Sequence, residues 1–217
     1  MQFTCPICHY KGAFKTYRTR DSALCPNCLA LERHRFQVAI LRRFVRDKVL
    51  PVGRCLHFAP ERSIASELSN WFSTYETADI QMKGVTHTID IQSMPFEDES
   101  FDFIFASHVL EHVRDDFSAI NELIRILSPG GIAVLPVPLM GLQTVEYEEP
   151  DPSQDYHVRA PGLDYFERYN QFSKVEIYTS AEVEEEYQPF VISDTAFNSP
   201  FHFTDNKIND YIPICYK

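Results

Sequence analysis

The chain has 217 residues, enough for one sizeable domain with a small appendage, and its 44% hydrophobic and 24% charged residues are typical of soluble globular proteins. No segment approaches the ~18 uninterrupted apolar residues of a membrane-spanning helix, and the N-terminus lacks the pattern of a secretory signal. These features argue against a membrane protein, and we expect a cytoplasmic protein without a membrane partner.

The net charge of −11 is unevenly distributed along the chain. Residues 1–50 contain ten lysines and arginines and three acidic residues, a net of +7, so the remaining residues carry −18. A basic front of this kind could bind a polyanion such as nucleic acid, or it could dock on the acidic body of the same chain. The sequence leaves both interpretations open.

Four cysteines near the N-terminus fall into two C-x2-C pairs separated by sixteen residues: Cys5, Cys8, Cys25 and Cys28. This spacing is typical of a structural zinc site, and a proline after the first cysteine of each pair pre-sets the turn. We expect residues 1–30 to form a zinc ribbon, in which the metal supplies folding energy that about thirty residues cannot. Disulfides or a redox pair are the alternatives, and a cytosolic chain disfavours disulfides.

An amphipathic helix is predicted directly after the ribbon, over residues 31–50. Phe36, Ile40, Leu41 and Phe44 recur at helical spacing, with arginines between them. This helix would link the ribbon to the main body of the chain.

The body, residues 51–217, alternates between short apolar runs and helical patterns. The pattern predicts strands at 54–58, 73–80, 84–91, 101–107 and 132–139, and helices at 63–72 and 115–127. Such alternation indicates a parallel sheet that is wound by helices on both faces. Residues 174–180 and 210–217 would add two strands as an antiparallel hairpin at the sheet edge.

Ligands of such sheets bind at the carboxyl ends of the strands. Four places are therefore candidates for a binding site: the loop after Phe58, and the residues around Asp79, Asp90 and Ser107. Asp79 stands 22 residues beyond His57, close to the spacing of about 20 expected between a cofactor loop and a ribose-binding acid.

One long segment, IDIQSMPFEDESFDFIFASHVLEHVRDDFSAINELIRILSPGGIAVLPVP, resembles class I S-adenosylmethionine-dependent methyltransferases. The matching pieces are the acid after the third strand, the PF-x-D-x-SFD lead-in, the VLEHV segment and the R-x-L-x-PGG turn. The resemblance covers about residues 52–140. A bacterial subgroup of that superfamily carries an N-terminal four-cysteine zinc ribbon. This chain resembles it in the LHFAPE loop, the front zinc ribbon and the segment YHVRAPGLDYFERY. Members of the subgroup often have a tyrosine where this chain has Pro161.

The resemblance implies an α/β fold: a Rossmann-like, doubly wound, mostly parallel seven-stranded sheet with an antiparallel edge strand, plus the small N-terminal zinc ribbon. It also implies S-adenosylmethionine as the cofactor. Strand alignment puts His57 where an acid usually stands, and Ala59, Glu61 and Ser63 where glycines usually stand. Glu61 could instead bind the cofactor's ammonium group.

By resemblance, Asp79 would hold the ribose hydroxyls and Asp90 the adenine amino group. The residues expected to bind the cofactor are His57, Phe58, Ala59, Pro60, Glu61, Asp79, Ile80, Asp90, Ile91, Ser107 and His108. The alternatives are that the two acids only cap turns or helices, and that the loop has degenerated and binds nothing.

Three histidines are candidate general bases for the acceptor: His108, His112 and His157. Arg159 is a candidate for binding an anionic group of the substrate. Residues 145–172 are expected to form a lid or substrate insert. Glu111 and His112 could alternatively serve only to cap a helix or bond loops.

Three functions follow. The leading one is methyl transfer to a small molecule or to a sugar or glycan precursor. The first alternative is an RNA methyltransferase that uses the basic ribbon, although the acidic body opposes phosphate binding. The second is a non-catalytic binding protein. The sequence indicates no oligomeric state.

Overall fold

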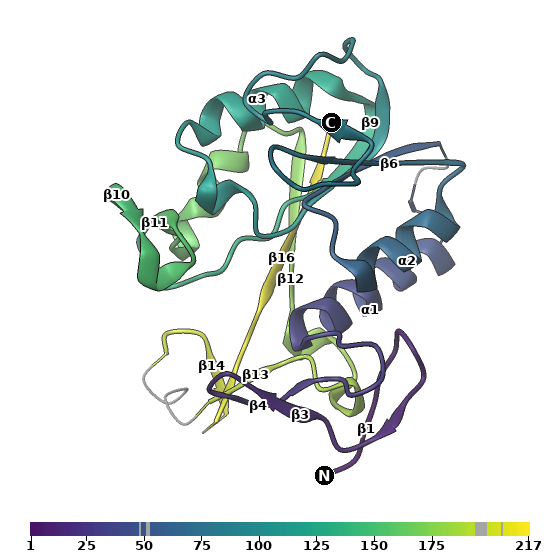
Figure 1. Ribbon diagram of the computed structural model, residues 1–217, viewed down its shortest axis with the longest axis vertical. Helices are drawn as coiled ribbons and strands as arrows, with labels where there is room; N and C mark the ends of the chain where they lie inside the picture. Colours follow the sequence, from purple (N-terminus) through teal and green to yellow (C-terminus); the bar gives the residue numbers. More distant parts are fainter. Residues whose placement is uncertain (48, 51–52, 194–198, 205) are drawn as a thin grey trace. The chain divides into compact units, whose positions relative to one another are not determined.

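The computed structural model describes residues 1–47, 49–50, 53–193, 199–204 and 206–217 (Figure 1). The chain divides into two compact units: Met1–Val49, Arg62–Glu67 and Tyr178–Tyr211 in the first, and Leu50–Glu61, Leu68–Ile177 and Ile212–Lys217 in the second. The first unit thus includes two segments that the sequence analysis grouped with the body. Lys48 of the basic front and residues 51–52, where the body was expected to begin, lie outside the described residues.

A seven-stranded sheet forms the frame of the second unit. Its order is β12 (Lys174–Thr179), β16 (Tyr211–Tyr216), β9 (Leu127–Val134), β8 (Phe101–Ala106), β5 (Arg54–Phe58), β6 (Thr74–Asp79) and β7 (His87–Thr88). The pairs from β9 through β7 are parallel, and β16 runs antiparallel to β9. The predicted seven-stranded, mostly parallel sheet is confirmed.

The central strands are buried on both faces, which explains their near-continuous apolar sequences. In β8, Phe101, Phe103 and Phe105 are all fully buried. Phe103 also stacks on Phe72, with ring centroids 4.8 Å apart. Each such phenylalanine contributes about 1.5–3 kcal/mol by leaving water.

Helix α3 (Asp116–Ile126) lies between β8 and β9 in the chain. It begins where the Asp115 side chain accepts a hydrogen bond from the Ser118 backbone nitrogen, at 3.0 Å. Strand β9 begins earlier than expected because the Pro-Gly-Gly turn lies inside it, where Gly130 has a φ of 75° that favours glycine. It ends before Pro136, which cannot donate to the ladder.

Residues 145–172 form a hairpin followed by a 3₁₀ segment. The hairpin consists of β10 (Val145–Asp151) and β11 (His157–Ala160), which run antiparallel around the short 3₁₀ turn η2 (Pro152–Gln154), and it is followed by η3 (Leu163–Tyr169). At its base, Gly162 lies so close to the Gln143 backbone that an added Cβ would come within 2.2 Å. Only glycine permits this approach.

The first unit combines short strands with helix α1 (Glu32–Arg46), which confirms the helix predicted after the ribbon. The other elements are α2 (Arg62–Trp71, shared with the second unit), β1 (Phe3–Thr4), β2 (Lys11–Gly12), β3 (Lys15–Tyr17), β4 (Arg20–Leu24), β13 (Val191–Ile192), β14 (His202–Thr204), β15 (Lys207–Ile208), η4 (Ser180–Glu182) and η5 (Glu185–Tyr187). Arg35 of α1 is fully buried and donates to the carbonyl oxygens of Ala23 and Ala30, at 2.7 and 2.8 Å. The arginines between the apolar positions of α1 are therefore not all on a solvated face.

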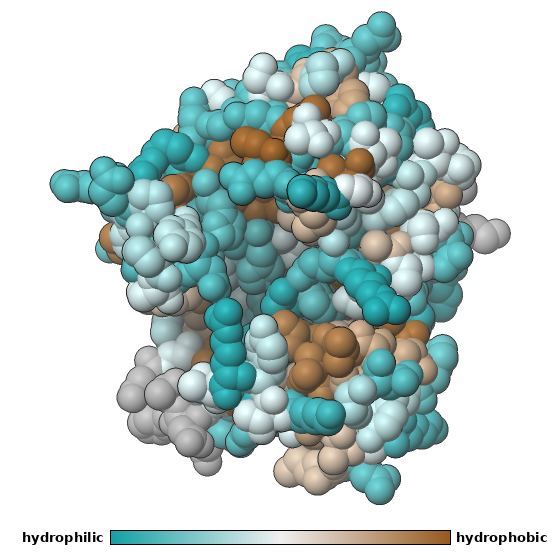
Figure 2. All heavy atoms as spheres, in the orientation of Figure 1, coloured by the Kyte–Doolittle hydropathy of each residue, from teal (hydrophilic) through white to brown (hydrophobic). Residues whose placement is uncertain are grey.

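Hydrophilic side chains cover most of the face drawn in Figure 2. Among the described residues, none of the helices has the length and apolar character needed to cross a membrane.

Candidate functional site

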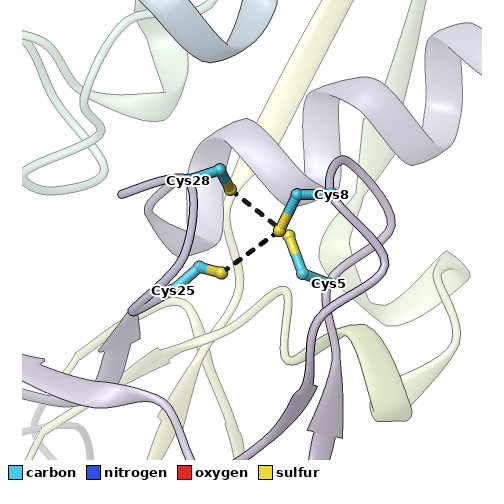
Figure 3. A group of neighbouring side chains, drawn as sticks. All are labelled: Cys5, Cys8, Cys25 and Cys28. Carbon is cyan, nitrogen blue, oxygen red and sulfur yellow. Dashed lines mark hydrogen bonds between the residues drawn. The ribbon is translucent and has the colours of Figure 1, made fainter.

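The four N-terminal cysteines converge on one point (Figure 3). One ligand atom of each lies within 4.8 Å of the others, and the Sγ–Sγ distances of Cys5–Cys28 and Cys8–Cys25 are both 3.6 Å. Sulfurs that bind one tetrahedral zinc ion at ~2.3 Å lie about 3.8 Å apart. The side chains therefore fit a closed, structural zinc site.

The two cysteine turns are near copies of each other in backbone structure. The nitrogen of Cys5 donates to Tyr10 and that of Cys25 to Ala30, at 2.8 and 2.9 Å. Each turn ends in a non-glycine residue with left-handed φ, 60° at His9 and 63° at Leu29. The hydrogen bond between Cys5 and Cys28 lowers the pKa of Cys5 to about 5 and raises the pKa of Cys28, while burial raises the pKa of Cys25. A thiolate is the form that binds metal.

A cavity of about 820 Å³ lies at the carboxyl ends of β5, β6 and β8, within the second unit. Its walls are Phe58, Ala59, Asp79, Ile80, Gln81, Ile89, Asp90, Ile91, Gln92, His108, Val109, His112, Val113, Arg114 and Tyr156. The cavity therefore brings together most of the expected cofactor residues. Pro60, Glu61 and Ser107 are not among the wall residues.

Ala59 occupies the tightest point of the loop after β5. Its φ is 45°, in the left-handed region, and its nitrogen donates to the Ala78 carbonyl oxygen at 2.9 Å. This conformation explains why glycine is usual at the corresponding position. Alanine is the smallest residue that could replace it, and it leaves the loop backbone open to the cavity.

The two strand-end acids both cap turns while they line the cavity. Oδ1 of Asp79 accepts hydrogen bonds from the backbone nitrogens of Gln81 and Met82, each at 2.7 Å. Oδ1 of Asp90 accepts from the Gln92 nitrogen at 2.8 Å. Turn capping and ligand binding are thus compatible, because each carboxylate has further lone pairs.

His57 does not reach the cavity. It is fully buried, its Nδ1 lies 2.8 Å from the hydroxyl of Tyr75, and its ring meets Phe105 edge to face. Burial lowers the pKa of His57 to about 4, against the opposing charge of Glu61. His57 is therefore a neutral core side chain at neutral pH.

Glu111 lies at the centre of a histidine cluster in the loop after β8 and in β11. It is fully buried, and neither of its carboxylate oxygens has a hydrogen-bond partner among the described residues. Its Oε1 lies 3.5 Å from Nδ1 of His108 and 4.0 Å from Nε2 of His157. The rings of His112 and His157 meet at 87°, with centroids 4.7 Å apart. The fold thus gathers all three candidate bases around one carboxylate.

Arg159 points to the main chain instead of the cavity. Its Nη1 donates to the carbonyl oxygens of Leu110 and Val113, at 2.7 and 2.6 Å, and its Nη2 to Arg114 at 3.0 Å. The side chain is almost fully buried, and Glu146 pairs with its Nε. Arg159 therefore holds the segment η1 (Leu110–His112) and the residues after it in place.

Sequence reasoning missed several wall residues of the cavity. Gln92, Arg114 and Tyr156 carry polar groups and line it, and although all three lie in segments that carry the family resemblance, none was singled out as a site residue. Two signals were available: Gln92 stands two residues after a strand-end acid, and Tyr156 opens the segment YHVRAPGLDYFERY. Tyr156 reaches the cavity through the β10–β11 hairpin, which no local pattern indicates.

Residues 54–135 match the family described as a methyltransferase domain. The matched segment runs from β5 to β9 and contains all the cavity walls except Tyr156. The chain is 49% identical to an uncharacterized methyltransferase from Mycobacterium sp. (strain JLS) over 43 residues, which are 20% of this chain and 17% of that protein. The chain is 37% identical to a demethylmenaquinone methyltransferase from Staphylococcus epidermidis over 59 residues, which are 27% of this chain and 24% of that protein. The chain spans less than a quarter of these curated relatives.

A solved structure shows the same fold over nearly the whole chain. A SAM-dependent methyltransferase from Archaeoglobus fulgidus has a TM-score of 0.54 and 17% identity, covering 85% of this chain and 94% of that one. The two chains therefore share a fold.

Proposed function

We propose that this protein transfers the methyl group of S-adenosylmethionine to a small molecule or to a sugar or glycan precursor. The observation that carries the proposal is the cavity at the ends of β5, β6 and β8, where Ala59, Asp79 and Asp90 meet inside the matched segment. The similarity to a demethylmenaquinone methyltransferase is compatible with a small acceptor.

The cavity residues divide the work of binding. Asp79 would accept the ribose hydroxyls and Asp90, with Ile91, the adenine amino group. The backbone at Ala59 and the side chain of His108 would border the methionine part. None of these contacts requires His57, whose Nδ1 faces Tyr75, or Arg159, whose guanidinium faces main-chain carbonyl oxygens.

In the reaction, the acceptor atom forms a bond to the methyl carbon as the carbon–sulfur bond breaks, and S-adenosylhomocysteine leaves. The chain contributes proximity and alignment. We assign the acceptor's proton to His108, which lines the cavity and has a carboxylate behind its Nδ1. Zinc in the cysteine cluster would stabilise the first unit.

Arginines of the basic front form ion pairs with acidic residues of the same chain, which supports a structural role for this region. Arg20 pairs with Glu32, Arg42 with Glu67 and Arg43 with Glu184, all within the first unit. Because these arginines are already paired with acids of the same chain, they have less charge to offer to RNA phosphates.

Calorimetry with S-adenosylhomocysteine tests the proposal. Asp79→Ala should weaken binding about 10–100-fold, because hydrogen bonds to a charged group are lost. Asp98→Ala is the matched control, since Asp98 is an exposed acid outside the cavity that pairs with Arg125. No binding by the wild type at saturating ligand would contradict the proposed function.

A further inference from the structure

Glu111 presents a buried carboxylate that no described residue satisfies. It is fully buried, and within the part of the chain that the structure describes both of its oxygens lack a hydrogen-bond donor. A buried charge without a hydrogen-bond partner is costly, and it persists where a cation pairs with it. The imidazoles of His108 and His157 lie 3.5 and 4.0 Å from one of the Glu111 oxygens, and imidazoles are metal ligands.

Three side chains, including Glu111 itself, place potential metal-ligand atoms close together. Glu111, His112 and His157 each offer one ligand atom, and these atoms lie within 4.8 Å of one another. Ligand atoms bound to one ion at ~2.1 Å lie about 3–3.5 Å apart, so small side-chain rotations close the site. We propose that Glu111, His112 and His157 form a centre for a divalent transition-metal ion beside the cavity.

The ligand types select the class of metal. Two imidazoles and one carboxylate suit Mn²⁺, Fe²⁺, Co²⁺ or Zn²⁺ better than the oxygen-seeking Mg²⁺ and Ca²⁺. Three protein ligands also leave coordination positions open. His112 lines the cavity, so the open positions face the space where an acceptor would bind.

The chain holds the ligands from two sides. Arg159 fixes the carbonyl oxygens that flank Glu111 and His112. Before His157, two consecutive non-glycine residues, Asp155 and Tyr156, have left-handed φ values of 53° and 64°. Such strained conformations persist where the surrounding structure enforces them.

The metal centre restricts the chemical class of the methyl acceptor, and this inference rests on the proposed function. An ion with open positions facing the cavity would bind an acceptor that offers an oxygen atom, such as a hydroxyl or carboxylate group. It also makes His112 and His157 ligands, which leaves His108 as the base.

Titration of the zinc-loaded full chain with Mn²⁺ tests the centre, with free Mn²⁺ followed by electron paramagnetic resonance. Thiolates already closed around zinc do not compete for this ion. The wild type should bind one equivalent. Since loss of residues that merely orient ligands costs about 10–100-fold in affinity, Glu111→Gln and His157→Ala should cost at least about 100-fold.

The control is His87→Asn. His87 also faces a carboxylate, Glu76, at 2.7 Å, but outside the cavity, and its replacement should leave Mn²⁺ affinity unchanged. Absence of saturable binding by the wild type, or equal binding by Glu111→Gln, would overturn the centre.

Thermal melting gives a second readout in which the order of the variants reverses. Without metal, Glu111→Gln should melt above the wild type, because a neutral amide costs less to bury than a carboxylate. With saturating Mn²⁺, the wild type should gain stability and Glu111→Gln should not. A wild type that melts unchanged with Mn²⁺ would count against the centre. Binding of S-adenosylhomocysteine is measured separately, so a failed metal centre and a failed methyltransferase give different results.

Discussion

The two clusters of metal-ligating side chains in this protein are built in opposite ways. The cysteines come from two similar turns close together in sequence, and their four sulfurs fill a tetrahedron. Glu111, His112 and His157 come from a 3₁₀ turn and a hairpin strand that are distant in sequence, and they provide three ligands beside a cavity. The closed cluster suits stability, and the open cluster suits chemistry.

Replacing a cysteine ligand should have the largest effect. Cys25→Ser opens the zinc site, and structural zinc contributes about 10 kcal/mol or more to folding. Zinc content should fall, and the first unit should lose its folded near-ultraviolet circular dichroism. Cys55→Ser is the control, because Cys55 is buried in β5 away from the cluster and should keep the zinc. A Cys25→Ser variant that retains zinc and a native spectrum would contradict a closed structural site.

The open cluster depends on a side chain that is not a ligand. Arg159→Met removes the charged donor to the carbonyl oxygens of Leu110 and Val113 and should cost about 3–5 kcal/mol of unfolding free energy. It should also weaken Mn²⁺ binding about 10–100-fold. Arg168→Met is the comparison, because Arg168 pairs with Asp116 and Glu146 and not with those carbonyls. Unchanged Mn²⁺ affinity in Arg159→Met would show that the loop is held by other contacts.

A buried histidine outside both clusters shows what burial does without a metal. Because the pKa of His57 is lowered to about 4 in the folded state, the unfolded chain, with a pKa near 6.5, takes up a proton first as the pH falls. Stability is therefore lost between pH 6.5 and pH 4, by at most about 3 kcal/mol.

His57→Asn should be less stable at pH 7 but should lack this part of the acid dependence, as measured by urea unfolding across that range. Tyr75→Phe removes the hydrogen-bond partner and should keep the dependence. Equal pH slopes in His57→Asn and the wild type would contradict a neutral buried imidazole.

The smallest expected change in stability comes from relieving backbone strain at the cysteine cluster and in the cavity loop. Leu29 beside the cysteines and Ala59 in the cavity loop are both left-handed without being glycine. Leu29→Gly and Ala59→Gly should each stabilise the protein by up to about 1 kcal/mol, because the left-handed strain exceeds the entropy cost of glycine. Ala65→Gly in α2 should cost about that amount. Destabilisation at both sites would show that the side chains matter more than the strain.

The sequence predicts the sheet well because its strands are buried runs of apolar residues bounded by polar turns. It also locates Asp79 and Asp90, because parallel strands bring their carboxyl ends to one edge. It does not reveal the partners of Arg159, since main-chain carbonyls leave no trace in residue types. Nor does it reveal that His157 faces Glu111, because this contact depends on how the hairpin folds back.

The β10–β11 hairpin combines two tasks at its turn. Tyr156 forms part of the cavity wall, and the neighbouring His157 belongs to the histidine cluster, while the acids that border the cavity at β6 and after β7 come from the sheet. In the proposed function, changes in the length and sequence of this one turn would therefore alter the wall around the acceptor while the residues assigned to the methyl donor stay constant.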